Sequence, residues 1–311
     1  MRGGNGTAVT EFVLLGFSGY GSLLGPLFWG VLLVYLVTLL GNLLIILLTL
    51  TDAALHVPMY FFLRHFSGLE ILYTTTVVPR MLADLLSSCP TILRASCFTQ
   101  MYFFSLFGIT ESGLLTAMAY DRYAAICRPL HYSTLLNPGA CVCLVGACYL
   151  MGIITSTTYS ILVFTLPFHG TNIIHHFLCD ILPVLSLASA STFWGEVGNL
   201  VTIAFILTPF SLIIVSYACI LVTILGVATS QGRRKVFSTC SSHLFVVMLF
   251  FGTGIVAYMR LGAGSSHTRD QILALFYAVV TPMFNPFVYT LRNKEVTGAI
   301  RRLVKKYLWS P

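Results

Sequence analysis

The chain has 311 residues, of which 57% are hydrophobic and only 9% are charged. Soluble globular domains usually carry about a quarter charged residues, so this composition excludes water as the main solvent and indicates a lipid bilayer. The formal net charge is +7, from 17 Lys and Arg against 10 Asp and Glu. Membrane topology explains such an excess first, with attraction to anionic lipid or an acidic cytosolic partner as the alternative. Nucleic acid is not an expected partner.

Seven apolar runs follow one another along the chain, and about 20 residues suffice to cross a bilayer as a helix. The first run carries no charge, whereas the second, third and seventh are less uniform. We therefore predict an all-α membrane protein, a seven-transmembrane helix bundle rather than a barrel of alternating segments. The expected spans are 24–50, 58–80, 97–122, 141–163, 197–227, 238–260 and 271–291.

The positions of Lys and Arg predict the orientation, because cytoplasmic loops carry the excess. With seven spans, the side of the N-terminus holds five of the 17 basic residues and the opposite side holds twelve. We expect a multi-pass plasma-membrane protein with an extracellular tail over 1–23, a seven-span domain over 24–291 and a cytoplasmic tail over 292–311. Asn5 begins a glycosylation sequon, and an outward tail would expose it to modification.

The cytoplasmic tail is predicted to be an amphipathic helix that lies in the membrane surface. Apolar residues recur there at helical spacing, namely Val296, Ile300, Leu303, Val304 and Tyr307. The remaining positions are rich in base, with Lys294, Arg301, Arg302, Lys305 and Lys306.

Residues 118–132 read MAYDRYAAICRPLHY, in which the charges of Asp121 and Arg122 end an apolar segment. Other strings follow in order: EFVLLGFS at 11–18, GN at 41–42, LHVPMYFFL at 55–63, PRML at 79–82, KVFSTCSSH at 235–243 and PMFNPFVYTLRN at 282–293. With these motifs the chain resembles, over its whole length, the vertebrate olfactory receptors, a branch of the rhodopsin-like G-protein-coupled receptors. The short loop 164–196 is similar to that of the tetrapod-type (class II) subgroup.

The resemblance implies a receptor, not an enzyme, that binds a small volatile odorant and activates a stimulatory heterotrimeric G protein, raising cyclic AMP. It assigns coupling or activation to Asp121, Arg122, Tyr123, Tyr217, Lys235, Asn285, Pro286 and Tyr289. Physically, Arg122 can extend to the cytoplasmic interface, and Asp121 can neutralise it while the inner face is closed. The alternative is an anchor pair that serves only membrane insertion.

Two acids, Glu70 and Glu111, lie in the middle of expected spans, where charge is expensive and usually functional. The resembling family commonly has acids at both positions. Two carboxylates in one dry site repel each other, so either a proton or a cation must join them. A sodium-like ion near Asn42 and Asn285 is one hypothesis, and a protonated acid hydrogen-bonded between helices is the other. No further cofactor is expected.

Prolines interrupt two spans, because proline removes a backbone donor and kinks a helix. Pro282 and Pro286 lie in the seventh span, and the family reading is a hinge that moves Tyr289 on activation. Pro209 lies in the fifth span above Tyr217.

Nine cysteines are present. Cys97 and Cys179 both face the oxidising side, where a disulfide is chemically allowed, and the resemblance implies that they are paired. A second pair usual in the family is missing, since its positions hold His169 and Ser189. His176, Cys179 and Asp180 match an H-x-x-C-D string that has been read as a metal site. A disulfide would consume the thiolate that such a site needs, although His169 and His176 could bind a metal weakly without it.

A ligand of a helical bundle is expected between helices, in a mostly apolar cavity with few polar groups. One face of the third span carries Phe104, Ser105, Gly108 and Ile109. The facing positions resemble the family's odorant contacts, namely Val201, Thr202, Phe205, Phe251, Ile255, Tyr258 and Ala278. Gly108 leaves room, the hydroxyls of Ser105, Thr202 and Tyr258 can bond, and no charge is present. We expect a small, neutral, mostly apolar volatile ligand.

Two other classes of seven-span protein are alternatives to a receptor. A transporter or channel would need inverted repeats or charged residues along a pathway, and neither is evident. An intramembrane hydrolase would need a paired catalytic set, and Asp121 has no matching aspartate.

Overall fold

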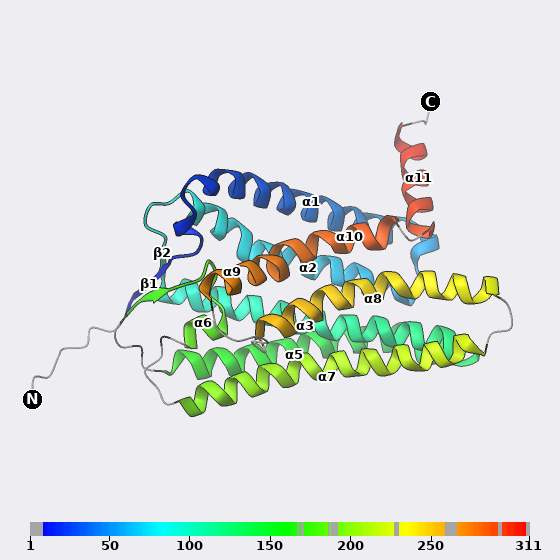
Figure 1. The fold of residues 1–311 in the computed structure, drawn as a ribbon. Helices are drawn as coiled ribbons and strands as arrows, with labels where there is room; N and C mark the ends of the chain where they lie inside the picture. The colour runs from blue at the N-terminus through cyan, green and yellow to red at the C-terminus, as the bar shows by residue number, and fades with distance from the viewer. Residues whose placement is uncertain are drawn as a thin grey trace, which may run out of the picture.

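The computed structural model describes residues 9–166, 168, 171–185, 187, 192–226, 230–258, 266–291 and 294–308. Within them, seven long helical segments form one bundle, with a small sheet at one end and a crosswise helix at the other (Figure 1). The predicted positions Asn5, His169 and Ser189 lie outside the described residues. The bundle helices are α1 (Leu24–Thr51), α2 (Pro58–Leu85), α3 (Arg94–Cys127), α5 (Pro138–Phe164), α7 (Thr192–Leu225), α8 (Ser230–Tyr258) and the segment α9 (His267–Leu275), η4 (Phe276–Val280) and α10 (Thr281–Leu291).

The prediction of a seven-helix bundle is confirmed. Five helical stretches in the described part of the chain are both long and apolar enough to cross a membrane: Gly19–Thr51, Pro138–Phe164, Leu200–Leu225, Cys240–Tyr258 and His267–Thr290. The helices α2 and α3 have 28 and 34 residues, which at 1.5 Å per residue exceeds a hydrocarbon core of roughly 30 Å. They are less apolar because they turn polar groups such as Thr74, Glu111 and Asp121 into the protein interior.

Local signals explain where the helices begin. Pro58 occupies the first turn of α2, and Pro138 occupies that of α5, where a missing N–H costs nothing. Asn137 caps α5, because its side-chain oxygen accepts a hydrogen bond from the amide of Ala140 at 2.9 Å. The outer faces of the bundle carry exposed apolar side chains, among them Leu33, Leu40, Leu150 and Val222. A surface of this kind requires lipid around it.

The seventh segment is not a uniform α-helix. Residues Phe276–Val280 form a π-helical turn between α9 and α10. Pro282 has no N–H to offer to the carbonyl four residues earlier, so a wider turn can accommodate the lost bond. The expected interruption of this span is therefore found one turn before Pro282, while Pro286 lies inside α10.

A three-stranded sheet at one end was not anticipated. Strand β1 (Glu11–Leu14) pairs antiparallel with β2 (Thr91–Leu93) and parallel with β3 (Ile173–Ile174). Phe12 and Leu14, two residues apart on the strand, both point inward and are buried, as expected for a strand with one buried face. The all-α description thus holds for the bundle, whereas the N-terminal tail, for which no strand was predicted, provides the middle strand of this sheet.

The two ends of the bundle differ. One end of the bundle, called the disulfide end, carries the sheet and the Cys97–Cys179 bond. The opposite end, called the Arg122 end, carries the C-terminal part of α3 with Arg122 and the crosswise helix α11 (Lys294–Leu308) (Figure 1). The tail is helical as predicted, with Val296 buried and Val304 41% exposed. Arg302 Nε lies 2.7 Å from Asp52 Oδ2, so α11 is tied to η2 (Ala53–Leu55) at the end of α1. Between α3 and α5, η3 (Pro129–His131) and α4 (Tyr132–Leu135) form a short connection.

Close backbone packing of α3 against α5 predicts a sharp effect of a small substitution. A Cβ added at Gly152 would lie 2.3 Å from Thr110 Oγ1 and 2.9 Å from the carbonyl oxygen of Leu106, whereas one added at Gly146 would have no atom within 4 Å. We expect Gly152→Ala to lower the melting temperature of the purified receptor by several degrees, since overpacking typically costs about 1–3 kcal/mol. Gly146→Ala is the matched control, and equal stability of the two variants would contradict the packing.

The disulfide gives a second prediction. Cys97 and Cys179 are bonded, with a Cα–Cα distance of 5.4 Å, which confirms the expected pair. Cys97→Ser and Cys179→Ser should each reduce surface delivery, because removing a native disulfide typically costs about 2–5 kcal/mol. The double variant should be no worse than either single one. Quantitative surface labelling measures this, and additive losses would show that each cysteine acts separately.

Candidate functional site

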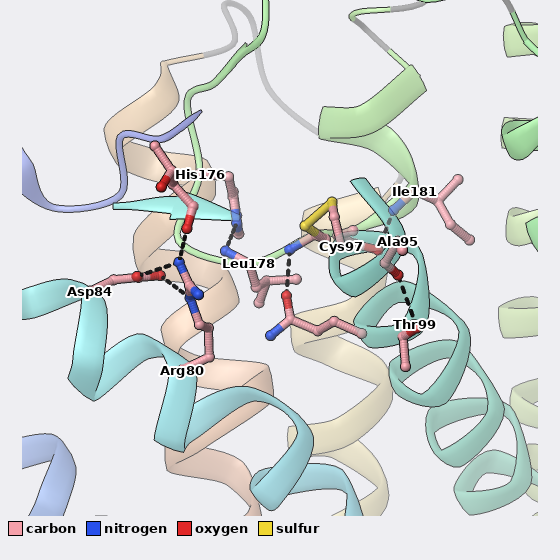
Figure 2. The surroundings of a disulfide bond; sticks show 12 residues. Arg80, Asp84, Ala95, Cys97, Thr99, His176, Leu178 and Ile181 are labelled. Atoms are coloured by element: carbon pink, nitrogen blue, oxygen red, sulfur yellow. Dashed lines mark hydrogen bonds and ion pairs between the residues drawn. A yellow bond between two sulfur atoms is a disulfide. The ribbon is translucent and has the colours of Figure 1, made fainter. Parts of the chain in front are cut away.

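The loop that follows β3 is fixed above the bundle by the disulfide and by hydrogen bonds. The amide of Cys179 donates to Gln100 Oε1 at 3.0 Å, and Gln100 Nε2 donates to the carbonyl oxygen of Thr76 at 3.1 Å. One glutamine therefore joins the loop, α3 and α2 beside the disulfide. Figure 2 shows the same region, with Arg80 paired to Asp84 at 2.8 Å on the neighbouring helix. The loop backbone is thus held against two helices.

His176 is buried in this loop and is not available as a metal ligand. Its Nδ1 accepts a hydrogen bond from the amide of Leu178 at 3.2 Å (Figure 2), and burial lowers the pKa of His176 to about 4. The imidazole is therefore neutral and already engaged at neutral pH. With Cys179 oxidised, the H-x-x-C-D string serves structure. The described residues contain no group of three or more His, Cys, Asp or Glu that could hold a metal.

Asp180 follows the disulfide and positions two tyrosines, Tyr258 and Tyr277, which form the roof of a cavity that Asp180 itself does not line. Its Oδ2 accepts hydrogen bonds from the hydroxyls of Tyr258 at 2.8 Å and Tyr277 at 3.1 Å, and its Oδ1 accepts from the amide of Ile181 at 2.7 Å. Burial raises the pKa of Asp180, while these hydrogen bonds act in the opposite direction. One buried carboxyl thus links the loop to α8 and to η4.

The cavity beneath this roof has a volume of about 120 Å³. An apolar protein cavity of about 150 Å³ accommodates benzene, so the space suits a compact molecule of similar size. Sixteen residues line it: Tyr73, Phe104, Ser105, Gly108, Ile109, Ser112, Tyr159, Ile181, Thr202, Phe205, Ile206, Phe250, Phe251, Gly254, Tyr258 and Tyr277. The lining is almost wholly apolar or aromatic, with hydroxyl groups as its polar part.

Eight of the eleven positions predicted to contact a ligand line this cavity, and Val201, Ile255 and Ala278 do not. Val201 is 38% exposed on α7, and Ala278 is fully buried in packing. On α8 the lining residues are Phe250, Phe251, Gly254 and Tyr258, so Ile255 falls beside that face. The π-helical turn changes the register of the seventh segment, and Tyr277 takes the place expected for Ala278.

Aromatic rings form one wall. Tyr73 stacks on Phe104 with ring centroids 4.9 Å apart, and Tyr277 lies 6.1 Å from Phe104 and 6.0 Å from Tyr258. Tyr73 and Tyr277 were missed in the sequence because neither lies beside a recognised motif. Ser112 could have been found, since it lies one helical turn below Gly108 on the predicted face.

The hydroxyl groups are unequal as ligand partners. The Tyr258 hydroxyl donates to Asp180, and those of Tyr159 and Thr202 lie 3.1 Å apart. Within the described residues the hydroxyls of Ser105 and Tyr73 have no hydrogen-bond partner, so these two are the most available to a bound molecule. A Cβ added at Gly108 would lie 3.6 Å from Tyr73 Cε2, an ordinary contact. Only a side chain larger than alanine would therefore fill the space.

The two buried acids lie together in the bundle core. Asn285 Nδ2 donates to Glu70 Oε1, and the Glu70 and Glu111 side chains are close enough to interact with each other. Several oxygen atoms are buried without a described partner: Asn42 Oδ1, Ser67 Oγ, Glu70 Oε2, Glu111 Oε2 and Asn285 Oδ1. Carboxylate, amide and hydroxyl oxygens are the donors that hard cations prefer, so these residues fit a sodium-like ion.

At the Arg122 end, the expected pairing of Asp121 with Arg122 is not found. Asp121 is buried and accepts a hydrogen bond from the Tyr132 hydroxyl at 2.8 Å. Arg80–Asp84 and Asp52–Arg302 are ion pairs among the described residues, whereas Asp121 and Arg122 are not within ion-pair distance of each other. Adjacent helical residues diverge by about 100° around the axis, so Asp121 and Arg122 face different neighbours.

Arg122 lies close enough to two activation residues predicted on other helices, Tyr217 and Tyr289, to act on them electrostatically. One of its terminal guanidinium nitrogens is buried without a partner in the described chain, as is the Tyr289 hydroxyl. The Tyr217 hydroxyl lies 2.7 Å from His243 Nδ1, and Arg122 acts electrostatically on Tyr217, His243 and Tyr289.

The other residues predicted for activation have separate surroundings. Tyr123 stacks with Tyr120, and Pro286 packs against Gly41. The side chain of Lys235 lies outside the described residues. His243 was missed, although the KVFSTCSSH string contains it.

Comparison with known proteins identifies the family. Residues 31–307 match the family model described as olfactory receptor. The chain is 75% identical over 308 residues to olfactory receptor 10P22 of Mus musculus, covering 99% of each chain. It is 60% identical to olfactory receptor 10P1 of Homo sapiens, covering 100% of each, and 50% identical to human olfactory receptor 10C1, covering 97% of each. Proteins of this family are signalling receptors and not enzymes. With its helical bundle, its disulfide and these relatives, the chain belongs to the vertebrate olfactory receptors, which are G-protein-coupled receptors of the membrane.

Proposed function

We propose that the receptor recognises a small, neutral, mostly apolar volatile molecule in the cavity below Asp180. The observation that carries this proposal is the combination of a small apolar volume with an available hydroxyl at Ser105. The one carboxylate at the roof already accepts three hydrogen bonds, so it has little capacity left for a ligand amine. Neutral alcohols, ketones, esters and simple aromatics have the matching size and polarity.

Coupling to a stimulatory heterotrimeric G protein, with a rise in cyclic AMP, is the signalling output that we propose. Arg122 and Tyr289 interact electrostatically, and each has a buried polar group without a partner among the described residues. A buried polar group without a partner costs about 1–3 kcal/mol, which favours rearrangement toward a state that supplies partners. The inserted segment of a G protein can offer such partners.

The proposed orientation has the N-terminus outside and the Arg122 end in the cytoplasm of the plasma membrane. The five-to-twelve division of basic residues supports it, and so does a disulfide at the opposite end, because disulfides persist in oxidising surroundings. The domain limits 1–23, 24–291 and 292–311 follow from this orientation. Glycosylation of Asn5 remains a prediction.

For the acid pair, a sodium-like ion and a shared proton remain the two proposals. A cation would be held by Glu70, Glu111, Asn42, Ser67 and Asn285, and it would supply a positive charge that allows both acids to ionise. Without a cation, a proton on one of the two acids would relieve the repulsion between them.

Filling the cavity should affect a ligand more than removing one hydrogen bond. Ser105→Ala should weaken an agonist severalfold, since a lost hydrogen bond costs about 0.5–1.5 kcal/mol, whereas Gly108→Leu should abolish the response by excluding the ligand. Gly108→Ala is the control for backbone effects and should keep most of the potency. A panel of volatiles tested on cells that report cyclic AMP gives the comparison. Potency within about threefold of wild type in Gly108→Leu would place the ligand elsewhere.

The signalling role of Arg122 can be tested without knowing the odorant. Arg122→Ala should lose nearly all agonist-independent and agonist-driven nucleotide exchange on a purified stimulatory G protein, while surface delivery is kept. Arg128→Ala, on the exposed connection after α3, is the matched control. Full exchange by the Arg122 variant at equal receptor amounts would refute the role.

A further inference from the structure

A groove of about 390 Å³ lies at the Arg122 end, on the outside of the bundle between the first turns of α2 and α5. Its lining includes Leu55, Val57, Phe61, Arg64, Leu136 and Val142. It is separate from the ligand cavity and from the acid pair, because it shares no residue with either. Nothing in odorant binding or in the proposed activation uses it.

The groove faces the surroundings of the bundle and not its core. Val57 is 46% exposed and Val142 is 59% exposed, and each stands on a different rim. Apolar side chains with this exposure are stable only when they are in contact with another apolar phase. In a membrane-spanning bundle, the phase that reaches them is the hydrocarbon of the bilayer, so the floor of the groove suits an acyl chain.

A positively charged side chain, that of Arg64, lies in this largely apolar groove. The Arg64 guanidinium lies 5.4 Å from the centre of the Phe61 ring, and no carboxylate of the described residues lies within ion-pair distance of it. Asp52, on the segment before the groove, is engaged by Arg302 at 2.7 Å. The groove also contains His56, and the amino ends of two long helices start beside it, which adds positive potential.

We propose that this groove binds an anionic phospholipid of the cytoplasmic leaflet. The phosphate group pairs with Arg64, which can form two hydrogen bonds to phosphate oxygens, and one acyl chain lies along Val57, Leu136 and Val142. Charge complementarity selects this occupant, since an unpaired guanidinium over an apolar floor matches an anion attached to a hydrocarbon chain. The leaflet follows from the orientation proposed above, but the binding itself does not depend on signalling.

Native mass spectrometry of the full-length receptor, delipidated in detergent, tests the proposal with phosphatidylserine and phosphatidylcholine as probes. Wild type should bind phosphatidylserine more tightly, and Arg64→Gln should lose about fivefold in that affinity, which corresponds to the ~1 kcal/mol expected for one basic residue near a membrane surface. Arg128→Gln removes the same charge from the same end outside the groove and should keep the preference. Val142→Trp, which fills the groove and leaves Arg64 in place, should weaken both lipids.

Three outcomes would overturn the proposal. Equal losses in Arg64→Gln and Arg128→Gln would indicate general surface charge. Unchanged binding in Val142→Trp would exclude the acyl chain from the groove, and competition by millimolar inorganic phosphate as strong as that by phosphatidylserine would indicate a free anion site. Because lipid binding is measured without a G protein or an odorant, failure of the signalling proposal would leave this result interpretable.

Discussion

The covalent bond between Cys97 and Cys179 decides where the loop above the bundle can lie. It holds the loop at the first turn of α3, and the next residue, Asp180, is thereby brought over the centre of the bundle. A carboxyl in that position is stable only because two tyrosine hydroxyls and one amide satisfy it. The position of Asp180, and with it the hydrogen bonds of Tyr258 and Tyr277, depends on this crosslink together with the hydrogen bond from the Cys179 amide to Gln100.

The sheet performs a related task from the other side. Strand β1 lies between β2 and β3, so the tail before α1 ties the connection after α2 to the loop after α5. The inward residue Phe12 meets Phe168 edge to face at 5.8 Å. Arg94, at the start of α3, lies 5.0 to 5.6 Å from the rings of Phe98, Phe164 and Phe168. Apolar packing and cation–π contacts thus give this end of the bundle a compact cover.

Sequence reasoning was sufficient where one physical rule dominates. Length and apolarity located the seven helices, because membrane insertion leaves few alternatives. The face of α3 from Phe104 to Ile109 was found because regular 3.6-residue spacing holds there. The prediction failed at Ala278, since a π-helical turn breaks that spacing, and the motif around Pro282 does not reveal the turn.

Other features depend on contacts between distant segments and could not be read from one motif. Strand β1 exists because two loops meet it, and the string EFVLLGFS alone does not contain its partners. Asp121 is hydrogen-bonded to Tyr132 and not to the adjacent Arg122, because helical geometry directs neighbouring residues to different sides, although the Arg122 charge still acts on Asp121. Proximity in the sequence was therefore a poor guide to the hydrogen-bond partner of Asp121, although this residue belongs to a motif that carries the family resemblance.

The arrangement of α8 suggests how these parts can act together. Pro286 of α10 packs tightly on α1, where a Cβ at Gly41 would come within 2.8 Å of its ring, so this part of the seventh segment is closely held. Among the described contacts that join α8 to other elements are two polar ones: Tyr258 to Asp180 at the cavity, and His243 to Tyr217 near Arg122. Each contact is worth about 0.5–1.5 kcal/mol. A ligand that competes for the Tyr258 hydroxyl changes one of these two contacts directly, and α8 is the rigid element that carries the change toward Arg122.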